Sequence, residues 1–314
     1  MGYKAYLLII VMLAFSPFAS AKNWACEKPG LDLDKLYNAF GQIRKEDDDN
    51  FAQTPEGEPL KDIQANRYRS LFSQCIKGRV TSTLIKSLDA KQHVRLFTAL
   101  NKVAFYTMDQ QVVRLMEMLT SAEFGISKVS DKQWQLLHRA YMMSRQFEKL
   151  NDLVKSHPLL FPEPLPVINA KAIDQRSLYQ VDKNKQSLSQ KPFEFPSGGH
   201  LVVVSSPICK PCKQAIGWLK SKPAVFDVVV KNSTWITPVF GDMFFDEIKQ
   251  SHKDYAPIEM KYTYQEGQWP EIEFWGTPSF YFYMDGKLVK QVVGWPGNDR
   301  AKALLAGLKA IALL

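Results

Sequence analysis

Two cysteines separated by two residues, Cys209 and Cys212, are the residues of this chain best suited to chemistry. They follow an apolar run at 201–204, which is typical of a buried strand, and they precede an amphipathic stretch at 212–220, which is typical of a helix. Backbone N–H groups at a helix start stabilise a thiolate, the nucleophilic form of cysteine. The pattern therefore predicts thiol–disulfide exchange, with Cys209 as the nucleophile near neutral pH.

Beyond the cysteines, roughly residues 195–314 resemble the thioredoxin superfamily in the order of their predicted elements. These are a strand at 201–205, the CxxC motif, a helix at 212–221, a strand at 225–231, the loop Trp275-Gly276-Thr277-Pro278-Ser279, a strand at 280–283, an Asp285-Gly286 turn, a strand at 287–293 and a helix from about 299. The resemblance implies an α/β C-terminal domain with a mixed sheet flanked by helices.

The same resemblance assigns roles around the motif. Cys209 would be the exposed attacking thiol, Cys212 the resolving thiol, and Pro278 a cis-proline that faces them in a loop that binds substrate chain. Thr277 before that proline is similar to the Dsb-family disulfide isomerases and their relatives. Ile208 departs from the aromatic residue that is common before the first cysteine in thioredoxins.

Several nearby residues have two interpretations. Lys210 and Pro211 either tune the redox site, by charge and by stiffening the helix start, or are simply two spacer residues. Trp275 and Trp295 either form an apolar rim that accepts unfolded chain or belong to ordinary core packing.

A zinc site is the main chemical alternative for the CxxC motif. Tetrahedral zinc takes four ligands, usually from a second CxxC or a paired-histidine motif. Cys26 and Cys75 lie far away in the sequence, and His200 and His252 have no paired spacing. We therefore expect neither a metal nor an organic cofactor.

The N-terminus has the pattern of a secretory signal, with Lys4 before an apolar stretch at 6–15 and Ala19-Ser20-Ala21 as a cleavage site. Cleavage after Ala21 would export the chain, to the periplasm of a diderm bacterium. The net charge of +8 would then fall to +7, and the basic residues are interleaved with acidic ones. This distribution gives no nucleic-acid signature.

Export places the remaining cysteines, Cys26 and Cys75, in an oxidising compartment. We interpret them as a structural disulfide, with two buried free thiols or a second redox pair as the alternatives. Closing a loop of about 50 residues stabilises a fold by roughly 4 kcal/mol.

The chain divides by its patterns into a signal peptide at 1–21, a helical domain at 22–157, a proline-rich linker at 158–166 and a thioredoxin-like domain at 167–314. The acidic run at 46–50 and the segment through Pro59 are expected to break the first helix. We interpret the run as a solvated loop and not as a calcium site, since no calcium-loop spacing follows it. The linker is expected to be extended and to hold the domains apart.

These features predict an exported thiol–disulfide oxidoreductase, with Thr277 and the large helical domain favouring an isomerase or reductase. Expected partners are proteins with disulfides or thiols, a membrane redox partner, and a second copy bound through the helical domain. The alternative is an envelope binding or assembly protein, in which the helical domain docks a partner and the thioredoxin-like domain holds a client.

Overall fold

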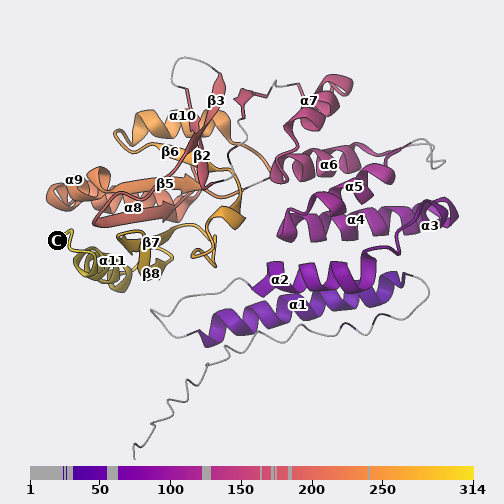
Figure 1. Ribbon diagram of the computed structural model, residues 1–314, viewed down its shortest axis with the longest axis horizontal. Helices are drawn as coiled ribbons and strands as arrows, with labels where there is room; N and C mark the ends of the chain where they lie inside the picture. Colours follow the sequence, from indigo (N-terminus) through magenta and orange to yellow (C-terminus); the bar gives the residue numbers. More distant parts are fainter. Residues whose placement is uncertain are drawn as a thin grey trace, which may run out of the picture.

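A computed structural model shows an all-helical half beside a half built on a β-sheet (Figure 1). It describes residues 24, 26, 31–54, 63–121, 129–162, 165–170, 173, 175–182, 186–239 and 241–314. The expected signal peptide and its cleavage site therefore lie outside the described residues. Within the described residues, no helix is both long enough and apolar enough to cross a bilayer.

Side chains satisfy the first free N–H groups of several helices in the helical half. Asp32 accepts from two backbone amides at the first helix, and Asp89 and Ser130 each form a reciprocal capping box with a glutamine three residues later. The elements are α1 (Leu33–Gln53), α2 (Ile63–Leu71), a π-helical turn (Phe72–Ile76), α3 (Ser82–Ser87), α4 (Ala90–Thr107), α5 (Gln110–Met118), α6 (Asp131–Met143) and α7 (Phe147–Ser156).

The acidic run at 46–50 does not break the first helix, contrary to the expectation from sequence. Helix α1 continues through it to Gln53. Side chains of α2 explain this result, since Arg67 pairs with Glu46 at 3.0 Å and Gln64 donates to Asp47. Packing against a neighbouring helix thus compensates the charge density that suggested a loop.

The second half is built on one mixed sheet. Its strands are β1 (Val167–Asn169), β2 (Ser177–Val181), β3 (Ser187–Pro192), β4 (Gly199–Val204), β5 (Ser233–Thr237), β6 (Met260–Thr263), β7 (Ser279–Met284) and β8 (Lys287–Val293), in the spatial order β1-β3-β2-β6-β5-β4-β7-β8. Strand β4 is parallel to β5 and antiparallel to β7, which forms a hairpin with β8. The expected mixed sheet is present.

The strand expected at 225–231 is wrong. Residues Pro223–Lys231 form helix α9, and the strand follows as β5. Proline is favoured in the first turn of a helix, and a short apolar run cannot by itself distinguish a buried strand from a buried helix. Only Val229 of α9 is fully buried, while Val225, Phe226 and Val230 pack partly against the core.

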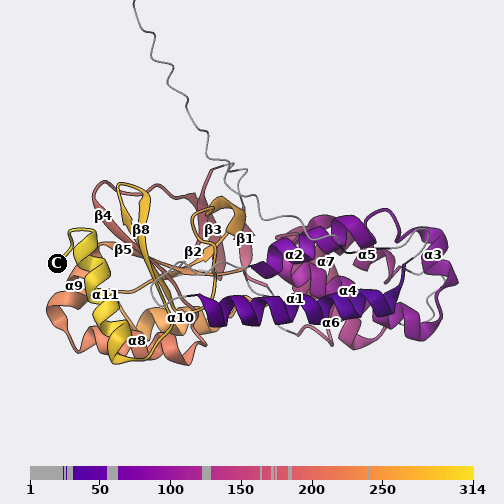
Figure 2. The same ribbon diagram turned by 90° about the horizontal axis from the view of Figure 1, so that it is seen from below.

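The two faces of the sheet are covered differently (Figure 2). Helices α8 (Lys210–Lys220), α9, α10 (Phe245–Asp254) and α11 (Asn298–Ala310) lie on one face, where they bury Leu201 and Val203 of β4. Val202 and Val204 point to the other face, where loop aromatics including Phe193, Phe195 and Trp269 form a second core. Strand β4, which leads into the CxxC motif, is therefore buried on both sides.

The proline-rich segment does not hold the two halves apart. Leu160 N–H and Phe161 N–H both donate to the His157 carbonyl at 3.0 Å, and the Phe161 ring stacks on His138 of α6 at 4.6 Å. The halves also touch directly through Arg145, which donates to the backbone carbonyls of Tyr264, at 2.9 Å, and Thr263. One apolar core continues across this contact.

Replacing Arg145 with methionine is expected to lower the free energy of unfolding by about 2–3 kcal/mol. Removing the guanidinium takes a hydrogen-bond donor from the Thr263 and Tyr264 carbonyls at the end of β6. Hydrogen bonds to a charged group cost more stability when they are lost than those between neutral groups. Burial lowers the pKa of Arg145 to about 10, so the group stays charged at pH 7.

The control is Arg139→Met, because the pair that Arg139 forms with Asp242 at 3.5 Å crosses the same boundary in solvent. Urea denaturation should show a loss below about 1 kcal/mol for this variant. Equal losses in the two variants would contradict a clamping role for Arg145.

Candidate functional site

The CxxC motif lies at the point where the central strand passes into helix α8. Ser205 N–H donates to the Ile236 carbonyl at 2.8 Å, which extends the β4–β5 pairing by one residue. Cys209 N–H then donates to the Ser206 carbonyl at 3.2 Å, and this turn places Cys209 at the N-cap of α8. At this position the sulfur accepts a hydrogen bond from the Cys212 N–H of the first turn.

The two sulfurs are bonded to each other but are unequal in access. The Cα atoms of Cys209 and Cys212 lie 5.2 Å apart, and Cys212 N–H donates to Cys209 Sγ at 3.1 Å. Cys212 is 1% exposed, whereas Cys209 is half-buried between Ile208, which is 52% exposed, and the exposed Lys210. An incoming sulfur can therefore reach Cys209 but not Cys212.

The Thr-Pro loop reaches the same sulfur from the far end of the sequence. The Thr277–Pro278 peptide bond is cis, and the Thr277 carbonyl oxygen lies 3.6 Å from Cys209 Sγ. Thr277 is half-buried and Pro278 is buried. Gly294 N–H donates to the Pro278 carbonyl at 2.8 Å, so the end of β8 holds this loop in place.

Gly276 contributes to the loop in a way that sequence reasoning did not assign. A Cβ atom added there would lie 2.3 Å from the Phe274 ring, so only glycine fits without movement. Ser279 Oγ donates to the Gly276 carbonyl at 2.7 Å, and Tyr281 Oη donates to the Phe274 carbonyl. The hydroxyls of β7 thus fold the loop back against its own strand.

The two tryptophans of the predicted rim occupy different positions. Trp275 is half-buried and packs against the second core, next to the Thr-Pro loop. Trp295 is also half-buried, and its ring lies 5.4 Å from Trp218 of α8 and 6.2 Å from Phe280 of β7. A rim that binds client chain stays a prediction for both residues.

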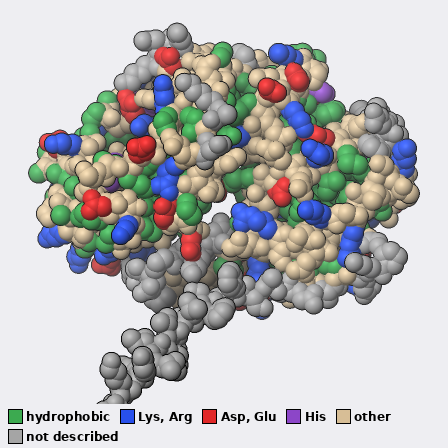
Figure 3. Space-filling model, in the orientation of Figure 1, with side chains coloured by type: hydrophobic (Ala, Val, Ile, Leu, Met, Phe, Trp, Pro, Cys, Tyr) green, Lys and Arg blue, Asp and Glu red, His purple; other side chains and the backbone are tan. Residues whose placement is uncertain are grey.

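A cleft between the two halves runs up to this loop, and no local sequence signal marks it. Its volume is about 650 Å³. The sheet-side wall includes Trp275 and Gly276, while the helical wall includes Arg69, Phe105 and Tyr106. Figure 3 shows the hollow between the halves, with basic side chains along its helical rim. The helical half therefore contributes a surface that faces the start of the Thr-Pro loop.

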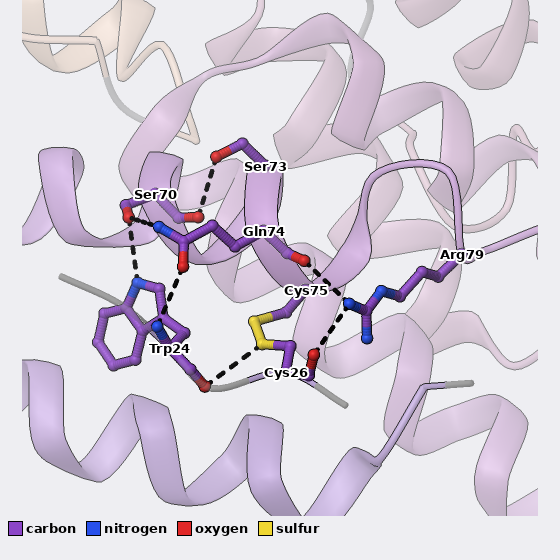
Figure 4. The surroundings of a disulfide bond; sticks show 7 residues. All are labelled: Trp24, Cys26, Ser70, Ser73, Gln74, Cys75 and Arg79. Carbon is purple, nitrogen blue, oxygen red and sulfur yellow. Dashed lines mark hydrogen bonds between the residues drawn. A yellow bond between two sulfur atoms is a disulfide. The ribbon is translucent and has the colours of Figure 1, made fainter. Parts of the chain in front are cut away.

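Cys26 and Cys75 form a disulfide within the helical half (Figure 4). Trp24 Nε1–H donates to Ser70 Oγ at 3.2 Å, and Trp24 N–H donates to the Gln74 side chain at 3.0 Å. Arg79 donates to the Cys26 carbonyl at 3.2 Å. The bond and these contacts attach the segment before α1 to α2 and the π-helical turn. Across the described ranges, no group of three or more His, Cys, Asp or Glu side chains is arranged to hold a metal ion.

His200 lies at the start of β4, the end of that strand opposite to the CxxC motif. Burial first, and repulsion by Lys261 second, lower its pKa to about 4. Its Nε2 lies 3.0 Å from Thr234 Oγ1, and the ring is packed among Phe193 and Phe195.

The protein is therefore expected to lose about 3 kcal/mol of stability as pH falls from about 6.5 to about 4. His200 stays neutral in the folded state over this range, while the unfolded chain takes up the proton at an ordinary pKa. Denaturant titrations at several pH values should show that His200→Gln flattens this dependence. His157→Gln, at the end of α7, is the control and should leave the slope in place. An unchanged slope in His200→Gln would contradict the assignment.

Together these features define a thioredoxin-like fold in the C-terminal half. Strand β4 leads into a helix that begins at the CxxC motif, and β5, the cis-proline loop, the β7–β8 hairpin and the final helix follow. No protein-family model and no curated protein matches the chain. Among solved structures, it is similar to a thioredoxin-like protein from Bacteroides caccae at 12% identity and a TM-score of 0.30, over 76% of this chain and 83% of that one.

Two further similar structures cover less of the chain. One is the C-terminal domain of an uncharacterized protein from Bacteroides fragilis, at 18% identity and a TM-score of 0.30, over 45% of this chain and 96% of that one. The other is a hypothetical protein from Sinorhizobium meliloti, at 16% identity and a TM-score of 0.29, over 46% and 85%. Likenesses this distant carry no function to this chain.

Proposed function

We propose that the protein is an exported thiol–disulfide oxidoreductase that acts on protein disulfides as an isomerase or reductase. One observation carries the proposal: a bonded Cys209–Cys212 pair at a helix start, with only Cys209 accessible and Thr277 beside it. Protein substrates, a membrane redox partner and a periplasmic location are parts of the same proposal.

The reaction needs only the two thiols of the reduced site and the substrate disulfide. The Cys209 thiolate attacks one substrate sulfur, so a Cys209–substrate bond forms, the substrate disulfide breaks, and the released thiolate takes a proton from water. The Cys212 thiolate then attacks Cys209 Sγ, which restores the bonded pair and releases the second substrate thiol. Two electrons pass to the substrate. In isomerisation, another thiolate of the substrate instead attacks the substrate sulfur of the mixed disulfide, so a new substrate disulfide forms, the bond to Cys209 breaks, and Cys209 leaves as the thiolate of the reduced site.

The thiol of Cys209 is expected to have a pKa below the free-cysteine value of about 8.5. The amide of Cys212 donates to this sulfur at 3.1 Å, and the N-terminal end of α8 and the charge of Lys210 favour the thiolate. Ultraviolet thiolate absorbance of Cys212→Ser, followed against pH, measures the value. A pKa at or above about 8.5 would contradict this expectation. Lys210→Gln should raise the pKa of Cys209.

Catalysed reduction of insulin by dithiothreitol tests the activity itself. The full-length protein should accelerate the reaction, and Cys209→Ser should run at the uncatalysed rate. Refolding of a scrambled disulfide protein then separates isomerase from reductase. A wild-type protein inactive in both assays would contradict the proposal.

The cleft between the halves gives one specific reason to keep the second candidate, a binding or assembly protein. In that case the surface of the helical half would hold a partner, and the CxxC pair would be dispensable. Complementation of a deletion strain by Cys209→Ser/Cys212→Ser distinguishes the two: full rescue favours assembly, and no rescue favours redox chemistry.

A further inference from the structure

The cleft described above borders the Thr-Pro loop at Trp275 and Gly276 and has the helical half as its other wall. Gly276 lies on its wall, and the next residue, Thr277, has its carbonyl oxygen 3.6 Å from Cys209 Sγ. A chain whose sulfur is bonded to Cys209 and which runs along the Thr-Pro loop therefore passes the mouth of this cleft. The helical wall there includes α2, the C-terminal end of α4, the start of α5 and the end of α6.

A second groove, of about 540 Å³, begins where the cleft ends. Phe105 and Tyr106 line both, and the groove continues between α1 and α4 past Phe40, Arg44 and Lys102. Phe105 is 52% exposed although it is a large apolar side chain. It is held edge-on against Tyr106 at 5.0 Å, and Tyr106 in turn stacks on Tyr68 at 4.5 Å. Phe105 is thus a fixed apolar platform between two hollows.

The groove is lined by two cations, Arg44 and Lys102, whereas the cleft has one cation, Arg69, on its helical wall and one carboxylate, Glu266, on its sheet-side wall. Arg69 and Arg44 are exposed on α2 and α1, and Lys102 lies 5.1 Å over the Phe40 ring. Burial, and after it repulsion by Arg44, lowers the pKa of Lys102. Two cations therefore share one groove and attract an anionic group more strongly than either does alone.

We propose that the cleft and the groove bind an extended segment of the client polypeptide that carries acidic residues, with an apolar side chain on Phe105. This inference rests on the proposed function, because it deepens the same site by naming the class of substrate chain. The two hollows, about 650 and 540 Å³, are each large enough for a small ligand, and they share Phe105 and Tyr106, so together they offer more room than one small ligand fills. A client chain fits both the length and the charge.

Peptide binding tests the inference without thiol chemistry. Full-length Cys209→Ser/Cys212→Ser protein is titrated with two labelled, cysteine-free peptides that share a central phenylalanine and carry either glutamates or lysines around it. Fluorescence anisotropy at low salt should give an affinity about tenfold higher for the glutamate peptide. The difference should shrink at high salt, because screening weakens exposed charges.

Matched variants locate the site. Arg69→Glu and Arg44→Glu/Lys102→Glu should each remove most of the preference, while Lys91→Glu, an exposed lysine at the start of α4, should keep it. Phe105→Ser should weaken both peptides about fivefold to tenfold. Val94→Ser removes an apolar side chain that is 50% exposed on the same helix and lines neither hollow, so it should change neither affinity.

Three results would overturn the inference: equal affinities for the two peptides, equal losses in the control variants, or displacement of the glutamate peptide by glutathione at equal concentration. Reduction of hydroxyethyl disulfide by the wild-type protein tests the proposed function separately. If this small disulfide is reduced and peptide binding shows no charge preference, only the cleft assignment fails. If peptides bind as expected and no disulfide is reduced, only the redox function fails.

Discussion

Changing Cys212 to serine is expected to trap client proteins on Cys209 as stable mixed disulfides, while changing Cys209 to serine should abolish exchange by at least about a thousandfold. The physical reason is the difference in access, since Cys212 is 1% exposed and only Cys209 can meet a client sulfur. Without the Cys212 thiolate, the mixed disulfide has no internal nucleophile to resolve it.

Non-reducing electrophoresis of extracts from cells that express the variant, followed by mass spectrometry of the adducts, measures the trapping. The two single variants control for each other, because each leaves one free thiol in the same motif. Adducts on the Cys209→Ser protein would mean that Cys212 opens to solvent, and the assigned order of attack would then be wrong.

Removing the Cys26–Cys75 bond is expected to lower the free energy of unfolding by about 4 kcal/mol, because the bond closes a loop with a sequence separation of 49. The hydrogen bonds that Trp24 donates to Ser70 and Gln74 should be lost at the same time. Redox activity of Cys26→Ser/Cys75→Ser should survive at temperatures where the protein is folded.

The second cysteine pair provides the matched control. Cys209 and Cys212 are separated by only 3 positions, so the same chain-entropy relation gives about 2 kcal/mol for Cys209→Ser/Cys212→Ser. Thermal denaturation of both double variants compares the two losses. A smaller loss for the long loop than for the short one would contradict a structural role for Cys26–Cys75.

The sequence was most informative where a local signal determines a local structure. An apolar run before CxxC predicts strand, turn and helix start within a dozen residues, and Asp285-Gly286 between two apolar runs predicts the β7–β8 hairpin. The same local reasoning failed at 225–231, because a valine-rich segment of this length suits a strand or a helix equally. There, Pro223 was the overlooked signal.

Features that depend on contacts between distant segments could not be predicted. The acidic run at 46–50 stays helical only because α2 supplies Arg67 and Gln64. The start of the linker packs against α6, because the Phe161 ring stacks on His138. The cleft next to Gly276 is formed by residues of both halves. The local sequence around the α2 and α4 residues that line it gives no sign that they will lie opposite the Thr-Pro loop.

The Arg145 contact has a kinetic consequence. Because it joins the two halves at the strand ends, the cleft walls are already in place before a client arrives. A preformed surface loses little conformational freedom when it is occupied, so clients should differ mainly in how long they stay. The cations Arg69, Arg44 and Lys102 should instead govern the association rate. Higher ionic strength should lower that rate and leave the residence times nearly unchanged.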